Sequence, residues 1–168
     1  MEVIRLPVEE WQQYRDLRLR ALKEDPQAFS TTYADAVGFP DEMWRGRLLD
    51  ALQDGHSWLF FAREAGKLVG MIGAFVDEAS PQTATIVSVY VPAEERGKGI
   101  SAAMMACILS ELSTNGALKK AVLAVNRAQL PAMGLYKKFG FQIVGMEPGV
   151  SGEGKPVEEL LMERPLPF

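Results

Sequence analysis

The chain has 168 residues, of which 48% are hydrophobic and 24% charged, as is typical of one globular domain with a sizeable core. Its formal net charge of −4 and pI near 5.1 argue against the basic face that nucleic-acid binding needs. A single cysteine excludes an internal disulfide, and we find no signal peptide and no apolar run of about 18 residues that would span a membrane. We therefore expect a cytoplasmic protein without nucleic-acid or membrane partners.

The first half of the chain predicts a short strand, a helical region and three strands joined by turns. Apolar side chains recur at three- and four-residue steps in the first helix, and Asp25-Pro26 ends it. The expected elements are strand Glu2–Leu6, helix Glu9–Glu24, a loop or broken helix over Gln27–Phe39, helix Pro40–Asp54, and strands Trp58–Arg63, Leu68–Val76 and Thr83–Val91. The turns between the three strands imply antiparallel pairing.

The second half alternates helices and strands. The expected elements are helix Gly99–Leu112, strand Leu118–Val125, helix Leu130–Phe139, and strands Phe141–Met146 and Pro156–Glu163, with a mobile hairpin tip over Gly149–Lys155. Together they predict an α/β fold with a mixed, mostly antiparallel sheet of about seven strands and flanking helices. The final strand and its hairpin offer a sheet edge suited to homodimer formation.

The most informative segment joins the strand Thr83–Val91 to the helix that follows it. A β-branched run ends at Pro92, and the next helix opens with Gly97 and Gly99 in its first turn. The first amides of a helix lack intrahelical partners and carry the positive end of the helix dipole. Glycines at this point let a phosphate approach the bare backbone, so the segment predicts a phosphate-binding turn.

Two common phosphate-binding motifs fit this turn poorly. The triphosphate loop needs G-x-x-x-x-G-K-[ST], but here a lysine lies between the two glycines. The dinucleotide pattern G-x-G-x-x-G/A is met by Gly97, Gly99 and Ala102. However, the next strand ends in Asn126 and Arg127, where that motif requires a carboxylate for the ribose. A nicotinamide oxidoreductase is therefore a weak alternative.

The segment Arg96–Ala102 resembles the pyrophosphate-binding turn R/Q-x-x-G-x-G/A of the GNAT acetyltransferases, with Ser101 where that family usually has Gly or Ala. A second segment, Ala132–Phe141, is similar to the A-x-x-L-Y-x-x-x-G-F signature of the same family and follows the first by one strand. The family's Asn three residues before this signature is Gln129 here, and an Asn lies earlier as Asn126. Two signatures in the right order make a chance match improbable.

This resemblance implies a GNAT-like fold and one acetyltransferase domain over residues 1–168. It implies a metal-independent N-acetyltransferase that moves an acetyl group from acetyl-CoA to a primary amine by direct attack in a ternary complex. The acceptor would be a small molecule or a peptide. In this family the strands before and after the turn splay apart and hold the pantetheine arm. The cofactor-binding residues that the resemblance carries over are Val89, Tyr90, Val91, Arg96, Gly97, Lys98, Gly99, Ile100, Ser101, Ala102, Asn126, Gln129 and Tyr136.

Acetyl transfer is helped by a donor to the developing oxyanion, a base for the amine and an acid for the leaving sulfur. The backbone N–H of Val89 is the candidate donor, and by its place in the second signature Tyr136 is the catalytic acid. Many relatives place a glutamate near the start of the strand that leads to the turn, where this sequence has Thr85, which cannot act as a base. Either a water chain carries the proton, or a carboxylate from the N-terminal helices reaches the site. The carboxylate candidates are Glu24, Asp35 and Glu42.

The sequence leaves two questions open. Because the glutamate is missing, a non-catalytic acyl-CoA sensor of the same fold is the alternative function. The aromatic residues of the N-terminal region either line an acceptor pocket or pack the two N-terminal helices onto the sheet. These residues are Phe29, Tyr33, Phe39 and Trp44.

Overall fold

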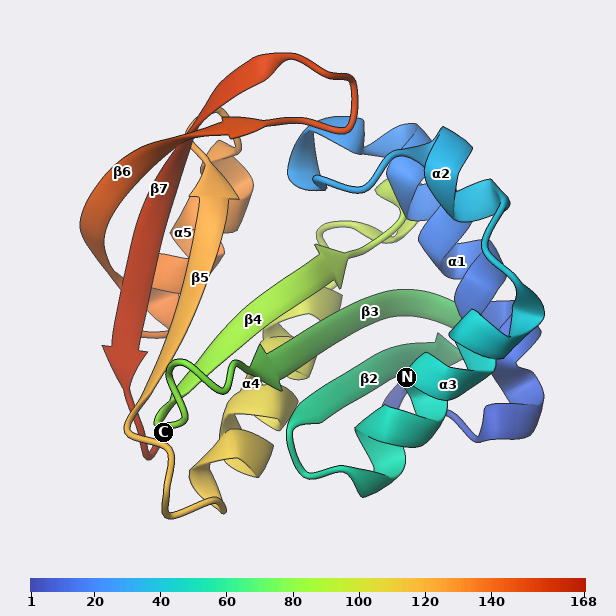
Figure 1. The fold of residues 1–168 in the computed structure, drawn as a ribbon, viewed down its shortest axis with the longest axis horizontal. Coiled ribbons are helices and arrows are strands. Elements are labelled where there is room, and N and C mark those ends of the chain that lie inside the picture. The colour runs from blue at the N-terminus through green and yellow to red at the C-terminus, as the bar shows by residue number, and fades with distance from the viewer.

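A seven-stranded sheet in the order β1-β2-β3-β4-β5-β7-β6 forms the centre of the structure (Figure 1). The computed structural model describes residues 1–168. The strands are β1 (Glu2–Ile4), β2 (Ser57–Glu64), β3 (Lys67–Val76), β4 (Thr83–Tyr90), β5 (Lys120–Asn126), β6 (Gln142–Val150) and β7 (Pro156–Pro165). The helices are α1 (Trp11–Glu24), α2 (Tyr33–Val37), α3 (Asp41–Gln53), α4 (Ile100–Ser113) and α5 (Leu130–Lys138). Short 3-10 turns are η1 (Val8–Glu10), η2 (Pro26–Ala28) and η3 (Ala93–Glu95). Only β4 and β5 pair in parallel, so the expected mixed, mostly antiparallel α/β fold is confirmed.

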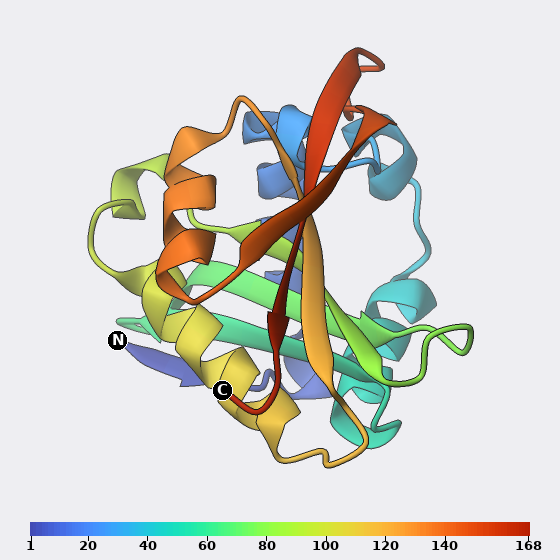
Figure 2. The ribbon, with the colours of Figure 1, turned by 90° about the vertical axis from the view of Figure 1, so that its left-hand side faces the viewer.

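Two cores lie on opposite faces of the sheet, because successive side chains of each strand point to opposite faces. One face is covered by α4 and α5 (Figure 2), with Met104 and Ile108 fully buried against the strands. The other face is covered by α1, α2 and α3, where the Trp44 ring meets Tyr14 edge-on at 5.4 Å. None of the helices is both long and apolar enough to cross a membrane.

The C-terminal hairpin differs most from the expectations. Strand β6 continues past Met146 to Val150, because its backbone pairs with β7 along this whole length. The tip is held against η2: the Gly152 N–H donates to the Pro26 carbonyl at 2.9 Å, and Ser151 is buried. The tip expected to be mobile therefore packs beside the N-terminal region, as Figure 1 shows.

The free edge of the sheet is also a different strand from the one expected. Strand β7 lies between β5 and β6, so the final strand is internal and β6 forms the edge. The hydrophobic side chains that β6 exposes are Ile143, Val144, Met146 and Val150. The homodimer stays a prediction, and the edge available for it is β6.

Candidate functional site

Strands β4 and β5 run side by side over only a short distance and then diverge. Their parallel pairing covers Thr83–Thr85 on β4 and Lys120–Val122 on β5. Beyond this point β4 stays paired with β3, and β5 stays paired with β7. Each strand therefore turns one unpaired backbone edge toward the gap, as the two diverging strands in Figure 1 show.

A bulge in β4 lies at this divergence. Gly73 of β3 faces Val87, and Met71 faces Tyr90, so β4 holds one residue more than β3 between these pairs. Ser88 has a φ of +58°, in the left-handed region that residues with a side chain rarely adopt. Such a bulge changes the direction of the following backbone groups, including the N–H of Val89.

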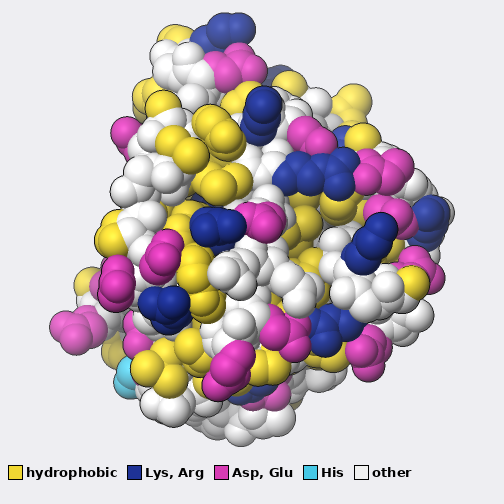
Figure 3. Space-filling view, turned by 90° about the vertical axis from the view of Figure 1, so that its right-hand side faces the viewer, with side chains coloured by type: hydrophobic (Ala, Val, Ile, Leu, Met, Phe, Trp, Pro, Cys, Tyr) yellow, Lys and Arg dark blue, Asp and Glu magenta, His cyan; other side chains and the backbone are white.

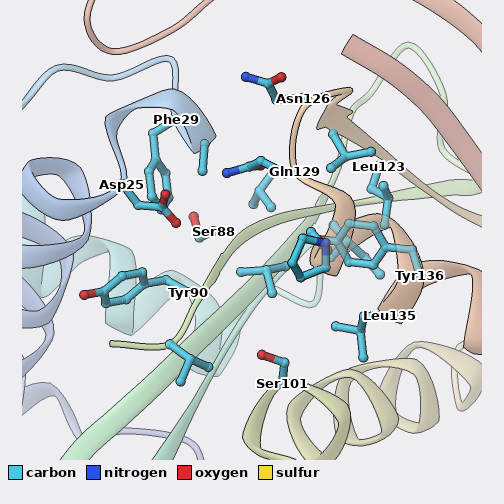
Figure 4. Close-up of a pocket in the computed structure, with 18 of the residues that line it drawn as sticks. Asp25, Phe29, Ser88, Tyr90, Ser101, Leu123, Asn126, Gln129, Leu135 and Tyr136 are labelled. Atoms are coloured by element: carbon cyan, nitrogen blue, oxygen red, sulfur yellow. The ribbon is translucent and has the colours of Figure 1, made fainter. Parts of the chain in front are cut away.

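A cavity of about 790 Å³ fills the space between the diverging strands. One wall comes from the end of α1 and η2, and the opposite wall from β5 and α5, with the start of α4 between them (Figure 4). The predicted site residues that line it are Val89, Tyr90, Val91, Arg96, Gly97, Gly99, Ile100, Ser101, Ala102, Asn126, Gln129 and Tyr136. Two segments about 30 residues apart in sequence therefore meet around one space.

The turn before α4 has the geometry of an anion site. Gly97 and Gly99 have φ values of +79° and +80°, and a Cβ at either position would meet nothing within 4 Å. The glycines are therefore required by the backbone conformation rather than by lack of space. Gly99 provides no side-chain cap, and the first backbone bond of the helix runs from Ala103 N to Gly99 O. The amides of the first turn, which include that of Ser101, are left available to a ligand at the positive end of the dipole.

The two basic residues of this turn have different surroundings. The Arg96 side chain lines the cavity; its Nε donates to the Val91 carbonyl at 3.0 Å, and its guanidinium lies 3.6 Å from the Asp25 carboxylate. Lys98 does not line the cavity but pairs with Glu95 at 2.6 Å, which raises the pKa of the lysine. Lys98 is thus the one predicted site residue that the structure places outside the cavity.

Tyr136 lies on α5 with its ring between the cavity and the core. It is 7% exposed, and its ring packs edge-on against Phe141 at 6.1 Å. Burial raises the pKa of its phenol to about 12. The phenol therefore stays protonated near neutral pH and can donate a hydrogen bond into the cavity.

The comparisons with known proteins agree with this geometry. Residues 10–141 match the sequence model of the acetyltransferase (GNAT) family. The chain belongs to this family. None of the curated proteins compared with the sequence matches it.

Solved structures of GNAT proteins share the fold at low sequence identity. A GNAT acetyltransferase from Streptococcus pneumoniae superposes with a TM-score of 0.87 at 16% identity, covering 98% of this chain and 99% of that one. A ribosomal-protein-alanine N-acetyltransferase from Brucella melitensis gives 0.82 at 18% identity, covering 99% and 100%. The PaiA N-acetyltransferase from Thermoplasma acidophilum, solved in complex with coenzyme A, gives 0.75 at 15% identity, covering 98% of each chain. At these identities the likeness establishes the fold alone.

The three carboxylates considered as a base in this GNAT protein do not reach the cavity. Glu24 accepts a hydrogen bond from the Tyr90 hydroxyl at 2.6 Å and pairs with Arg20, and both contacts lower its pKa. Tyr90 consequently turns its side chain toward α1 and offers the cavity chiefly its backbone. Asp35 lies in α2 and Glu42 in α3, and neither lines the cavity.

The neighbouring residue Asp25 does line the cavity. It is the residue at which α1 ends, and its non-helical backbone, with φ −134° and ψ 49°, directs it away from the helix. Burial raises the pKa of its carboxyl, against the opposing effect of Arg96. The sequence analysis used Asp25 only as a helix stop signal, and its place beside the GNAT turn requires the folded chain.

The four aromatic residues of the N-terminal region differ in whether they line the cavity or pack in the core. Trp44 is 1% exposed and Phe39 packs against it at 5.8 Å, so both belong to the core under α1 and α3. Tyr33 does not line the cavity either, since its ring lies at the surface beneath Lys23. Phe29 alone lines the cavity, where it also packs with the buried residues of α1.

Three further charged residues line the cavity without having been predicted there: Glu95, from the turn before α4, and two residues from distant elements. Arg18 enters from α1, and its Nη1 donates to Ser88 Oγ at 2.7 Å. Glu159 enters from β7 on the opposite side. Neither residue belongs to a motif, and no local signal in the sequence distinguishes Arg18 from the other arginines of its helix.

Proposed function

We propose that the protein transfers the acetyl group of acetyl-CoA to the nitrogen of a primary amine, by direct attack within a ternary complex. The observation that carries the proposal is the cavity between β4 and β5, which connects the uncapped start of α4 with the bulge at Ser88. Direct transfer requires the coenzyme and the acceptor to lie side by side, and one continuous cavity supports this proposal.

The residues present fit acetyl-CoA. The amides before Ala103 and the guanidinium of Arg96 would hold the diphosphate, because they combine an uncapped helix start with a fixed positive charge. The unpaired edges of β4 and β5 would bond the amide groups of the pantetheine arm, with Val89 and Val91 on the β4 side. Asn126 and Gln129 line the same space from the β5 side.

Acetyl-CoA supplies an acyl group activated as a thioester. In the transfer, the amine nitrogen forms a bond to the carbonyl carbon, the carbon–sulfur bond breaks, and one proton passes from the amine to solvent or an acceptor while the sulfur gains one. The Val89 N–H, turned by the bulge, would donate to the carbonyl oxygen as negative charge develops on it. Tyr136 would donate its phenol proton, by hydrogen bond or by transfer, to the departing sulfur.

The acceptor amine must lose its proton before or during attack. Thr85 lines the cavity but has no basic group. Asp25 is the carboxylate of the N-terminal region that lines it, and we propose that Asp25 accepts the amine proton through a water. The acceptor amine would then enter from the side of α1 and η2, opposite Tyr136 in Figure 4.

The test is a thiol-release assay with acetyl-CoA across a broad panel of amines, combined with calorimetry of coenzyme binding. We expect micromolar binding that is abolished in Gly99→Asp, which adds bulk and negative charge at the turn. Ser101→Glu is a second variant, because an acidic residue suits the start of a helix and should preserve the fold while repelling a diphosphate.

Ser110→Glu is the matched control, since it makes the same change on the exposed side of α4 far from the turn. Equal acetyl-CoA affinity in wild type and in folded Gly99→Asp and Ser101→Glu proteins would place the coenzyme elsewhere. Tight binding without thiol release for any amine would instead favour the acyl-CoA sensor.

A further inference from the structure

The Arg18 guanidinium is a cation of the cavity wall that has no acidic partner. Its one hydrogen bond goes to Ser88 Oγ, and its face lies over the Phe29 ring at 4.6 Å. An arginine carries five N–H donors and stays charged in proteins, so most of its hydrogen-bonding capacity is unused here. Burial lowers the pKa of Arg18; Tyr14 opposes this shift, and the charge of Arg47 adds to it.

Other arginines of α1 differ in this respect. Arg15 pairs with Asp16 at 2.9 Å, and Arg20 pairs with Glu24 at 2.7 Å. On the face formed by the N-terminal helices, Lys and Arg side chains lie interspersed with Asp and Glu (Figure 3). Arg96, the other arginine of the cavity, lies beside Asp25. With Arg96 assigned to the diphosphate, Arg18 is the cavity arginine left to compensate a negative charge on the acceptor.

The position of Arg18 is next to the proposed reaction centre. Its partner Ser88 immediately precedes Val89, whose N–H is the proposed donor to the carbonyl oxygen. Three carboxylates line the same cavity: Glu95 is paired with Lys98, and Asp25 and Glu159 favour a cationic group. A ligand with an amine and a negative group close together would match both kinds of charge.

We propose that Arg18 binds a carboxylate of the acceptor, so that the acceptors are amines that also carry a carboxylate, such as free amino acids. This inference rests on the proposed function and names its substrate class. The planar guanidinium suits a carboxylate because it can donate two parallel hydrogen bonds, and Ser88 Oγ holds it in place. The partly buried position strengthens the pairing, because little water competes for the same donors.

A purely structural role for Arg18 predicts a different pattern of activity loss across acceptors. If Arg18 only holds the bulge at Ser88, its loss would disturb the Val89 amide and slow the acetylation of every acceptor alike. If it binds a carboxylate, its loss would affect only acceptors that carry one. The contrast between an acid and its uncharged amide therefore separates the two roles.

The first experiment measures kcat/KM for the common amino acids and for their C-terminal amides, with thiol release as the signal. We expect kcat/KM to be about 10- to 100-fold higher for the acids than for the amides, because a hydrogen bond between charged groups contributes a free energy of this size. Arg18→Met should abolish this preference without changing the KM for acetyl-CoA, and Arg18→Lys should keep part of it. Arg15→Met, on the exposed side of the same helix, should keep all of it. Equal use of acids and amides by the wild type, or equal loss for both in Arg18→Met, would overturn the proposal.

The second experiment does not depend on turnover. Calorimetry measures the binding of N-acetylglycine and of N-acetylglycinamide to the complex with coenzyme A, since these small products differ only in the carboxylate. We expect N-acetylglycine to bind about 10-fold or more tightly than the amide, and Arg18→Met to remove the difference. Failure of N-acetylglycine to bind more tightly than the amide would overturn the carboxylate site. Absence of turnover with every amine, together with Arg18-dependent binding, would overturn the proposed function and leave the carboxylate site standing.

Discussion

Replacing Tyr136 by Phe removes one hydroxyl group and leaves the rest of the site in place. The ring packs against Phe141, and this contact survives the change. Burial is the only cause of the raised phenol pKa, so no hydrogen bond to another residue is broken when the hydroxyl is lost. We therefore expect the free energy of unfolding to change by no more than about 0.5 kcal/mol.

The effect on turnover should be far larger. If the phenol donates to the departing sulfur, its loss should lower kcat by roughly 10²–10⁴-fold, which is about 2.7–5.4 kcal/mol in the activation free energy. Acetyl-CoA affinity should hardly change, because the hydroxyl acts on charge that develops only during the reaction. With a pKa of about 12, the phenol is protonated throughout the usual assay range, so the loss should be the same from pH 7 to pH 9.

The assay is thiol release at saturating acetyl-CoA with any acceptor that the wild type uses well, alongside calorimetry of coenzyme binding. Tyr33→Phe is the control, because Tyr33 is exposed on α2 and does not line the cavity. Full turnover by a folded Tyr136→Phe protein would refute the catalytic role and leave Tyr136 as a core residue.

Two further predictions concern pH. The cavity lining contains no histidine or cysteine, and Asp25 is proposed to act only through a water, so kcat/KM should rise with pH toward the pKa of each acceptor amine, near 8 for a peptide α-amine and above 10 for a lysine side chain. The same inflection near pH 6–7 for two acceptors of different pKa would contradict this expectation and would show that an enzyme group, with Asp25 as the candidate, sets the pH dependence. The folded pKa of Glu24 is lowered by Tyr90 and Arg20, so this carboxylate should stabilise the fold above its ordinary pKa of about 4.5 and lose that contribution as pH falls through its folded value. Thermal unfolding from pH 7 to pH 3 should accordingly show a smaller acid-induced loss in Glu24→Gln, and an unchanged loss would contradict the pairing.

The coenzyme half of the cavity could be predicted from the sequence because it is built from short contiguous segments. The turn needs glycine at two left-handed positions, and that requirement appears directly in the chain as Gly97 and Gly99. The second signature places Tyr136 on a short helix that packs beside the same turn. Lys98 is the exception, since local reasoning could not show that it pairs with Glu95, three residues earlier, and does not line the cavity.

The acceptor half could not be predicted, because its contacts join residues that are far apart in the chain. Arg18 meets Ser88 across 70 positions, and the sequence gives no sign of the bulge that makes this contact. The choice between Glu24 and Asp25 depends on where α1 ends: the last helical residue faces Tyr90, whereas the next one leaves the helix and lines the cavity.

The end of α1 therefore connects the two halves of the site. Arg20 pairs with Glu94 at 2.8 Å, immediately before the phosphate turn, and Asp25 lies beside Arg96 within that turn. About two turns before Asp25 in the chain, Arg18 of the same helix holds Ser88 at the bulge. A single helix end thus fixes the position of the anion-binding turn, of the bulged amide and of the acceptor wall relative to one another. In the proposed direct transfer this arrangement would align the two substrates, because reacting groups must be held closely in one geometry.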